Sequence, residues 1–107
     1  MAGFSKMSER FDLVVSKAVD EGLLVLGASV RHSIYYYVER NRQVKREEIP
    51  SRIAVFHEAL EGLLGAGAVV IEKLIAKDLY SRLSLTFEEH EDWTLVDYAR
   101  YAQKAKK

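Results

Sequence analysis

Apolar residues recur at every third or fourth position in each long segment of this chain, and this spacing constrains the fold more than any other feature. It places the apolar side chains on one face of an α-helix, whereas a half-buried strand would alternate them. We therefore expect an all-α fold, a compact bundle of four to five helices that bury these faces together. In the first segment the stripe consists of Phe11, Val14, Val15, Ala18 and Val19.

The first half of the chain predicts two helices. One is expected from residue 5 or 8 to about residue 21, and the next from residue 23 or 28 to residue 41. Gly27 leaves open whether they are separate or form one kinked helix. The stripe expected on the second helix is Leu26, Val30, Ile34, Tyr37 and Val38.

A third helix is expected to begin at Pro50, because proline cannot sit inside a helix but suits its first turn. Ser51 is a plausible N-cap. Gly65 is placed to end this helix in a left-handed conformation. Its predicted apolar face is Ile53, Phe56, Leu60, Leu63 and Leu64.

Two further helices are expected in the second half. Residues 66–83 carry an apolar arc so wide that it predicts burial from more than one side. Residues 84–87 alternate and suggest a short extended segment. The last helix has a start signal in Thr94 and Asp97, which resemble a capping box, and in Trp93 and Tyr98, which fit a hydrophobic staple.

The length of 107 residues suits one domain, so we treat residues 1–107 as a single helical domain with frayed ends at residues 1–7 and 103–107. The absence of cysteine excludes disulfides, thiolate metal sites and thiol catalysis. No stretch has the apolar core of a signal peptide or the roughly 20 apolar residues of a membrane helix. We expect a cytoplasmic protein without membrane contact.

Two polar residues fall within predicted apolar faces. Glu72 lies in the apolar arc of the fourth helix, between Ala68 and Ala76. A buried carboxylate must be paired, protonated or part of a site, and pairing with an arginine or a tyrosine hydroxyl is the expectation. His57 lies beside Phe56, and we expect a hydrogen-bonded core or interface histidine rather than a ligand. No catalytic residue, cofactor site or metal site is predicted.

Several apolar and aromatic residues do not fit a single small core. Tyr35, Tyr36 and Tyr37 are consecutive and span about 200° of a helix, so they cannot all face inward. Val70 and Leu74 lie outside the apolar arc of their helix. A half-buried tyrosine with a solvated hydroxyl is the simpler interpretation, and an interaction surface is the other. On the second interpretation we predict a homo-oligomer, most simply a two-fold dimer.

Charge is balanced over the whole chain, with 16 basic and 16 acidic residues, so any binding to DNA needs a local patch. A basic group lies in and after the second helix and is diluted by nearby glutamates. A solvated surface is its simpler explanation, and nucleic-acid contact is the alternative. It could also meet the acidic residues 88–92 across a dimer interface. The basic group is Arg31, Arg40, Arg42, Lys45 and Arg46.

The stretch from about residue 11 to residue 98 resembles a small archaeal family of helical domains, the fifth type of Nitrososphaera output domain. The resemblance rests on residues 46–50 (REEIP), 63–68 (LLGAGA), 71–75 (IEKLI) and 78–80 (DLY). It implies a helical module that stands alone or is associated with signalling, and it brings no catalytic residues with it.

Three functions follow from these features. The leading hypothesis is a non-enzymatic helical interaction or output module that associates with itself or with another protein. The alternative is a nucleic-acid-binding regulator that uses the basic group. The third is an enzyme or ligand binder built around Glu72 and His57, which a concave pocket lined by these two residues and a tyrosine would favour.

Overall fold

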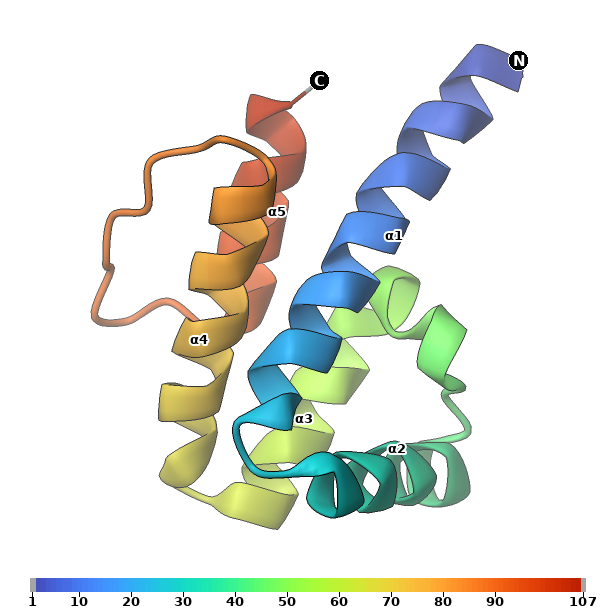
Figure 1. The fold of residues 1–107 in the computed structure, drawn as a ribbon, viewed down its shortest axis with the longest axis vertical. Coiled ribbons are helices and arrows are strands. Elements are labelled where there is room, and N and C mark those ends of the chain that lie inside the picture. The colour runs from blue at the N-terminus through green and yellow to red at the C-terminus, as the bar shows by residue number, and fades with distance from the viewer. Residues whose placement is uncertain (1, 107) are drawn as a thin grey trace.

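Each long apolar stripe of the sequence forms an α-helix in the structure, a computed structural model that describes the backbone of residues 2–106 and the side chains of residues 9–106. Within that range no strand occurs, which confirms the all-α fold. Two short 3-10 turns, Arg46–Glu48 and Pro50–Arg52, connect α2 to α3. The helices (Figure 1) are α1 (Ala2–Leu24), α2 (Ala28–Arg42), α3 (Ile53–Leu64), α4 (Gly67–Arg82) and α5 (Leu95–Ala105).

The first two helices are separate rather than one kinked helix. A tight turn joins them, and it contains Gly27 with a φ of 99°, a backbone conformation that residues with a Cβ atom rarely adopt. The first helix is longer than predicted at both ends, beginning at Ala2 and continuing through Gly22 to Leu24. Figure 1 shows that α2 turns sharply away from the axis of α1.

The wide apolar arc of α4 is explained by its central position. It packs against α1, α3 and α5, and in Figure 1 α1 and α4 lie side by side and run in opposite directions. Three neighbours require apolar side chains on three sides of one helix, as the arc predicted. The buried apolar residues of α4 are Ala68, Ile71, Ile75, Ala76, Leu79 and Tyr80.

The helices α1 and α4 approach each other closely at Gly22. A Cβ atom built on this glycine would overlap Cγ1 of Ile75 and lie 3.3 Å from the Ile75 Cα atom. A glycine in the middle of a helix normally destabilises it, since it adds conformational freedom to the unfolded chain. The absence of a side chain here lets the two helix backbones pack together, and this explains why α1 continues through a glycine.

Four local predictions were wrong. Ser51 does not cap α3: it lies in a 3-10 turn, its hydroxyl donates to the Glu48 carbonyl oxygen, and α3 begins at Ile53. Val30 and Leu63, predicted to face the core, are exposed at the surface, where they line a shallow groove between α2 and α3 that no other element covers. Residues 84–87 are not extended throughout, because Ser84 lies in a turn with a φ of 58°.

The positions predicted for the C-terminal end of α3 and for the start of α5 were correct. Gly65 ends α3 with a φ of 56°, although its ψ of −131° lies outside the left-handed helical region. Thr94 is the N-cap of α5: its amide donates to Asp97 Oδ2 at 2.8 Å, and its hydroxyl accepts from the Val96 amide at 3.2 Å. The rings of Trp93 and Tyr98 pack edge to face 5.1 Å apart, which completes the predicted staple.

No helix within the described part of the chain is both long enough and apolar enough to cross a membrane.

Candidate functional site

A carboxylate buried at the junction of three helices organises the most polar part of the interior. Glu72, on α4, is only 5% exposed. One carboxylate oxygen lies 2.6 Å from Nδ1 of His57 on α3, and the other accepts the backbone amide of Leu95, the first residue of α5, at 3.0 Å. The first amides of a helix have no partner within the helix, and a negative charge at this end is favourable. Glu72 therefore caps α5 and holds the imidazole of His57.

The predicted burial of Glu72 is what the structure shows, but the predicted partner was wrong. The expected arginine or tyrosine hydroxyl is absent, and an imidazole and a backbone amide take its place. His57 is half-buried, and its second nitrogen, Nε2, lies 3.4 Å from the exposed carboxylate of Glu61, one turn along α3. The His57 ring thus lies between one buried and one exposed carboxylate.

This pair opens onto a cleft of about 320 Å³ between α3, α4 and the loop that leads into α5. We call it the acidic cleft, because it carries more carboxylates than amines. Among the residues that the structure describes, no three histidine, aspartate or glutamate side chains are placed to hold a metal ion. The acidic cleft is lined chiefly by His57, Glu61, Glu72, Lys73, Glu89, His90, Glu91, Trp93 and Tyr98.

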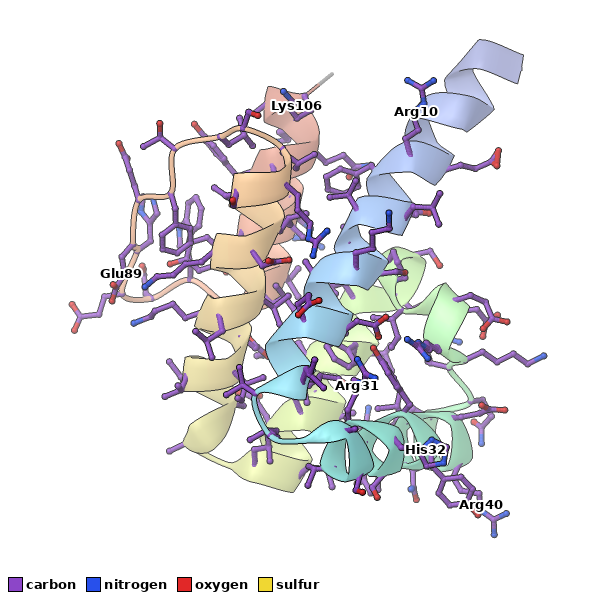
Figure 2. The ribbon with its side chains drawn as sticks, viewed as in Figure 1. Arg10, Arg31, His32, Arg40, Glu89 and Lys106 are labelled. Carbon is purple, nitrogen blue, oxygen red and sulfur yellow. The ribbon has the colours of Figure 1, made fainter. Side chains whose placement is uncertain are left out.

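The outer wall of the acidic cleft is a loop, residues 83–94, held in place by side chains. Lys73 Nζ lies 2.6 Å from Glu89 Oε2; this contact raises the pKa of the lysine and lowers the pKa of the glutamate. The ring of His90 stacks on Trp93 with centroids 3.8 Å apart. Figure 2 shows Glu89 on this loop.

Tyr98 fastens the loop to α5, and Tyr80 joins α4 to α5 beside it. The Tyr98 hydroxyl accepts the His90 amide at 2.9 Å, and the Tyr80 hydroxyl donates to the Tyr98 carbonyl oxygen at 2.8 Å. Burial raises the pKa of Tyr80 to about 12, because the ionised phenolate would lose its hydration. These contacts give the acidic cleft a fixed wall rather than a free loop.

A second polar cluster joins α1, α2 and the turn after α2. The Tyr35 hydroxyl donates to Asp20, whose other oxygen lies 2.5 Å from Arg46, and the guanidinium of Arg46 lies 4.7 Å from the centre of the Tyr35 ring. Arg31 donates to the Asp20 carbonyl oxygen at 3.5 Å. Burial, and then the bond to Asp20, raise the pKa of Tyr35. Two residues of the basic group are thus occupied by contacts within the chain.

The remaining basic residues do not form one cationic face. Arg42 pairs with Glu58 at 3.0 Å. Arg40 and Lys45 are exposed, and the guanidinium of Arg40 lies 5.9 Å from the ring centre of Tyr36. Figure 2 shows Arg40 and Glu89 on opposite sides of the molecule, so the basic and acidic segments do not meet within one copy. Their contact across a dimer interface stays a prediction.

The four candidate interface residues lie in different surroundings. Tyr35 is half-buried in the cluster just described. Tyr36 is exposed beside Arg40. Leu74 is half-buried against the core, whereas Val70 is 61% exposed in the first turn of α4. Of the four, Val70 belongs to the largest group of exposed apolar side chains.

That group forms a surface that the sequence reasoning missed. Figure 1 shows the end of α1, the start of α2, the end of α3 and the start of α4 gathered at one end of the bundle. Six of the nine large apolar side chains that are exposed among the described residues come from these four helix ends and the turn between α1 and α2. We call this surface the uncharged end, and its exposed apolar residues are Leu24, Val25, Val30, Leu63, Val69 and Val70.

A signal for this surface is present in the sequence. Residues 22–30 and 62–71 contain no Asp, Glu, Lys, Arg or His, although charged residues make up 30% of the chain. Each segment includes a turn between helices, where polar residues are the usual choice. The lack of charge in both turns predicts that another surface covers them. The fold brings the two turns to the same end of the bundle.

No family model, no curated protein and no solved structure matches this chain. The relationship to the fifth type of Nitrososphaera output domain, and the signalling role that it implies, stay predictions.

Proposed function

We propose that this protein is a non-enzymatic helical interaction module that associates with a second copy of itself through the uncharged end. The supporting observation is the concentration of exposed apolar side chains on that surface. Soluble monomers rarely leave a large contiguous apolar patch in water, and such patches usually mark interaction sites. Val25 and Val70, at 66% and 61% exposed, have no apolar cover within the chain.

The charges support a second copy as the partner. In a two-fold dimer a surface faces itself, so a patch of one sign would repel its own copy near the axis, whereas an uncharged patch does not. The exposed or part-exposed charged residues that border the two uncharged segments are of both signs: Glu21 and Arg31 border the first, and Glu61 and Lys73 border the second, where the intervening Glu72 is buried. A border of mixed sign can form ion pairs between copies, and it lacks the positive excess that attracts nucleic acid or anionic lipid.

The test places a charge on the uncharged end and measures mass in solution. We expect the unaltered protein to form dimers at micromolar concentrations in sedimentation or light scattering. The double substitution Val30→Glu with Leu63→Glu should give monomers, because each dimer would then bury four unpaired carboxylates. Helical content by circular dichroism should stay close to that of the unaltered protein, since both side chains are exposed.

Leu13→Glu is the matched control. Leu13 is an apolar residue of α1, 62% exposed and distant from the uncharged end, so its replacement adds charge without touching the proposed interface. Dimers should persist in this variant. A strict monomer for the unaltered protein at hundreds of micromolar would contradict the proposal, and so would equal loss of dimer in the control.

A second candidate function is favoured by the acidic cleft. Its walls include His57, Glu72 and Tyr98, the combination that indicates a ligand binder. The excess of carboxylates over Lys73 favours a small organic cation. The nucleic-acid alternative has less support, because Arg42 and Arg46 pair with carboxylates of the same chain.

Trp93, the one tryptophan of the chain, lines the acidic cleft and serves as a fluorescent reporter. If the cleft binds organic cations, titration with guanidinium or ethylammonium at low millimolar concentration should change the Trp93 emission to saturation. Acetate at the same ionic strength controls for screening. The expected change should be lost in Glu61→Gln, which removes an exposed carboxylate beside His57. An identical response to acetate would contradict cation binding.

A further inference from the structure

An apolar groove of about 300 Å³ opens in the uncharged end, between α2 and α3. None of its walls carries a charge, and the polar groups among them are two serine hydroxyls. A groove with this lining suits aliphatic side chains, which lose little on leaving water. The lining residues are Ser29, Val30, Ser33, Ile34, Leu63 and Leu64.

The turn between α3 and α4 follows this groove directly in the chain and contains only small residues. It consists of Gly65 and Ala66, and the next residue, Gly67, is the first of α4. A Cβ added at Gly65 would find no atom within 4 Å, and one added at Gly67 would find only Leu64 Cβ at 3.8 Å. Packing against its own chain therefore does not require a glycine at position 67, whereas Gly65 is already favoured by its φ of 56°. The backbone of the turn is open to close approach from outside.

Beyond the turn, Val70 is exposed in the first turn of α4. The turn thus lies between the apolar groove, which ends at Leu64, and the exposed side chain of Val70. In a two-fold dimer each contact occurs twice, with residue i of one copy against residue j of the other and the reverse. With a two-fold axis between the groove and Val70, Val70 of each copy could contact the groove of the other copy.

We propose that the two-fold axis of the self-associated form passes beside Ala66, so that Val70 of each copy enters the α2–α3 groove of the other. This inference rests on the proposed self-association. It explains why Ala66 and Gly67 are small, because larger side chains on the axis would face their own copies and hold the two backbones apart. The same arrangement also fills the groove and buries Val70.

The absence of cysteine in the chain gives a direct test. A residue on a two-fold axis faces its own copy, so Ala66→Cys should form a disulfide between copies if the two Cα atoms lie within about 7 Å. We expect oxidation of dilute Ala66→Cys to give covalent dimers at roughly ten times the rate of Ser81→Cys or more, because thiols held together react at an effective concentration of about millimolar. Ser81 is exposed at the far end of α4 and is the matched control.

A second substitution tests the role of Val70. Val70→Asp added to Ala66→Cys should reduce the cross-linking rate to that of Ser81→Cys, whereas Leu13→Asp should leave it unchanged. If the unaltered protein is a dimer by sedimentation but Ala66→Cys cross-links no faster than the control, the position of the axis is wrong and self-association stands. If the unaltered protein is a monomer, both proposals fail. Binding of monomers to neutral phosphatidylcholine vesicles would replace the second copy by a lipid surface and overturn the inference.

Discussion

Replacement of Gly22 with alanine is expected to destabilise the protein by about 1–3 kcal/mol, the usual cost of forcing extra atoms into a packed interior. The added methyl group would overlap Ile75 Cγ1, and the Ile75 backbone lies only 3.3 Å away. Rotation of the Ile75 side chain cannot relieve both contacts, so α1 and α4 must move apart. Because α4 also contacts α3 and α5, this displacement would disturb packing throughout the bundle.

Gly62→Ala is the matched control and should change stability in the opposite direction. Gly62 also lies inside a helix, but a Cβ there meets no atom within 4 Å. Replacing an exposed helical glycine with alanine stabilises a protein by about 0.5–1 kcal/mol. Urea unfolding followed by circular dichroism measures both effects. A stabilising Gly22→Ala would show that the two helices do not meet at this glycine.

Glu72→Ala is expected to reduce the free energy of unfolding by about 3 kcal/mol, in the range found when one partner of a buried polar pair is removed. The substitution would leave His57 Nδ1 and the Leu95 amide without their carboxylate partner, and α5 would lose the negative charge at its N-terminus. Because the carboxylate joins α3, α4 and α5, the loss should also reduce hydrogen-exchange protection at the start of α5.

Two variants separate this role from a general effect of charge. Glu61→Ala removes the exposed carboxylate beside the same imidazole and should cost less than about 1 kcal/mol, as surface ion pairs do. Glu72→Gln keeps an acceptor oxygen and should fall between the two. Denaturant unfolding measures the loss of unfolding free energy for each variant. Equal losses for Glu72→Ala and Glu61→Ala would show that burial does not make Glu72 the stronger partner of His57.

Much of the fold could be read from local sequence. The spacing of Val15, Ala18 and Val19 identified the core face of α1, and Gly65 identified the end of α3. The cap and staple at residues 93–98 were predicted residue by residue, because their partners lie within a few positions of one another. Such features depend on backbone geometry over one or two helical turns, so neighbouring residues are sufficient to specify them.

The candidate sites could be predicted only in part. The position of Glu72 within an apolar arc was evident from helical periodicity, but its partners come from 15 residues earlier and 23 residues later in the chain. The same holds for Tyr35, whose bond to Asp20 depends on how α1 and α2 cross. Periodicity defines the face of a helix on which a residue lies and leaves open which other helix will cover it.

The sequence by itself determined that the chain folds into amphipathic helices with defined ends, since helix periodicity and capping are local properties of the backbone. Only the tertiary structure decided that two uncharged turns, some forty residues apart in the chain, lie at one end of the bundle. It also decided that Val30 and Leu63 face solvent there, although each continues an apolar stripe. The physical reason is that burial depends on the crossing angles and lengths of all the helices together. A stripe that extends beyond its neighbouring helix stays exposed unless another molecule covers it.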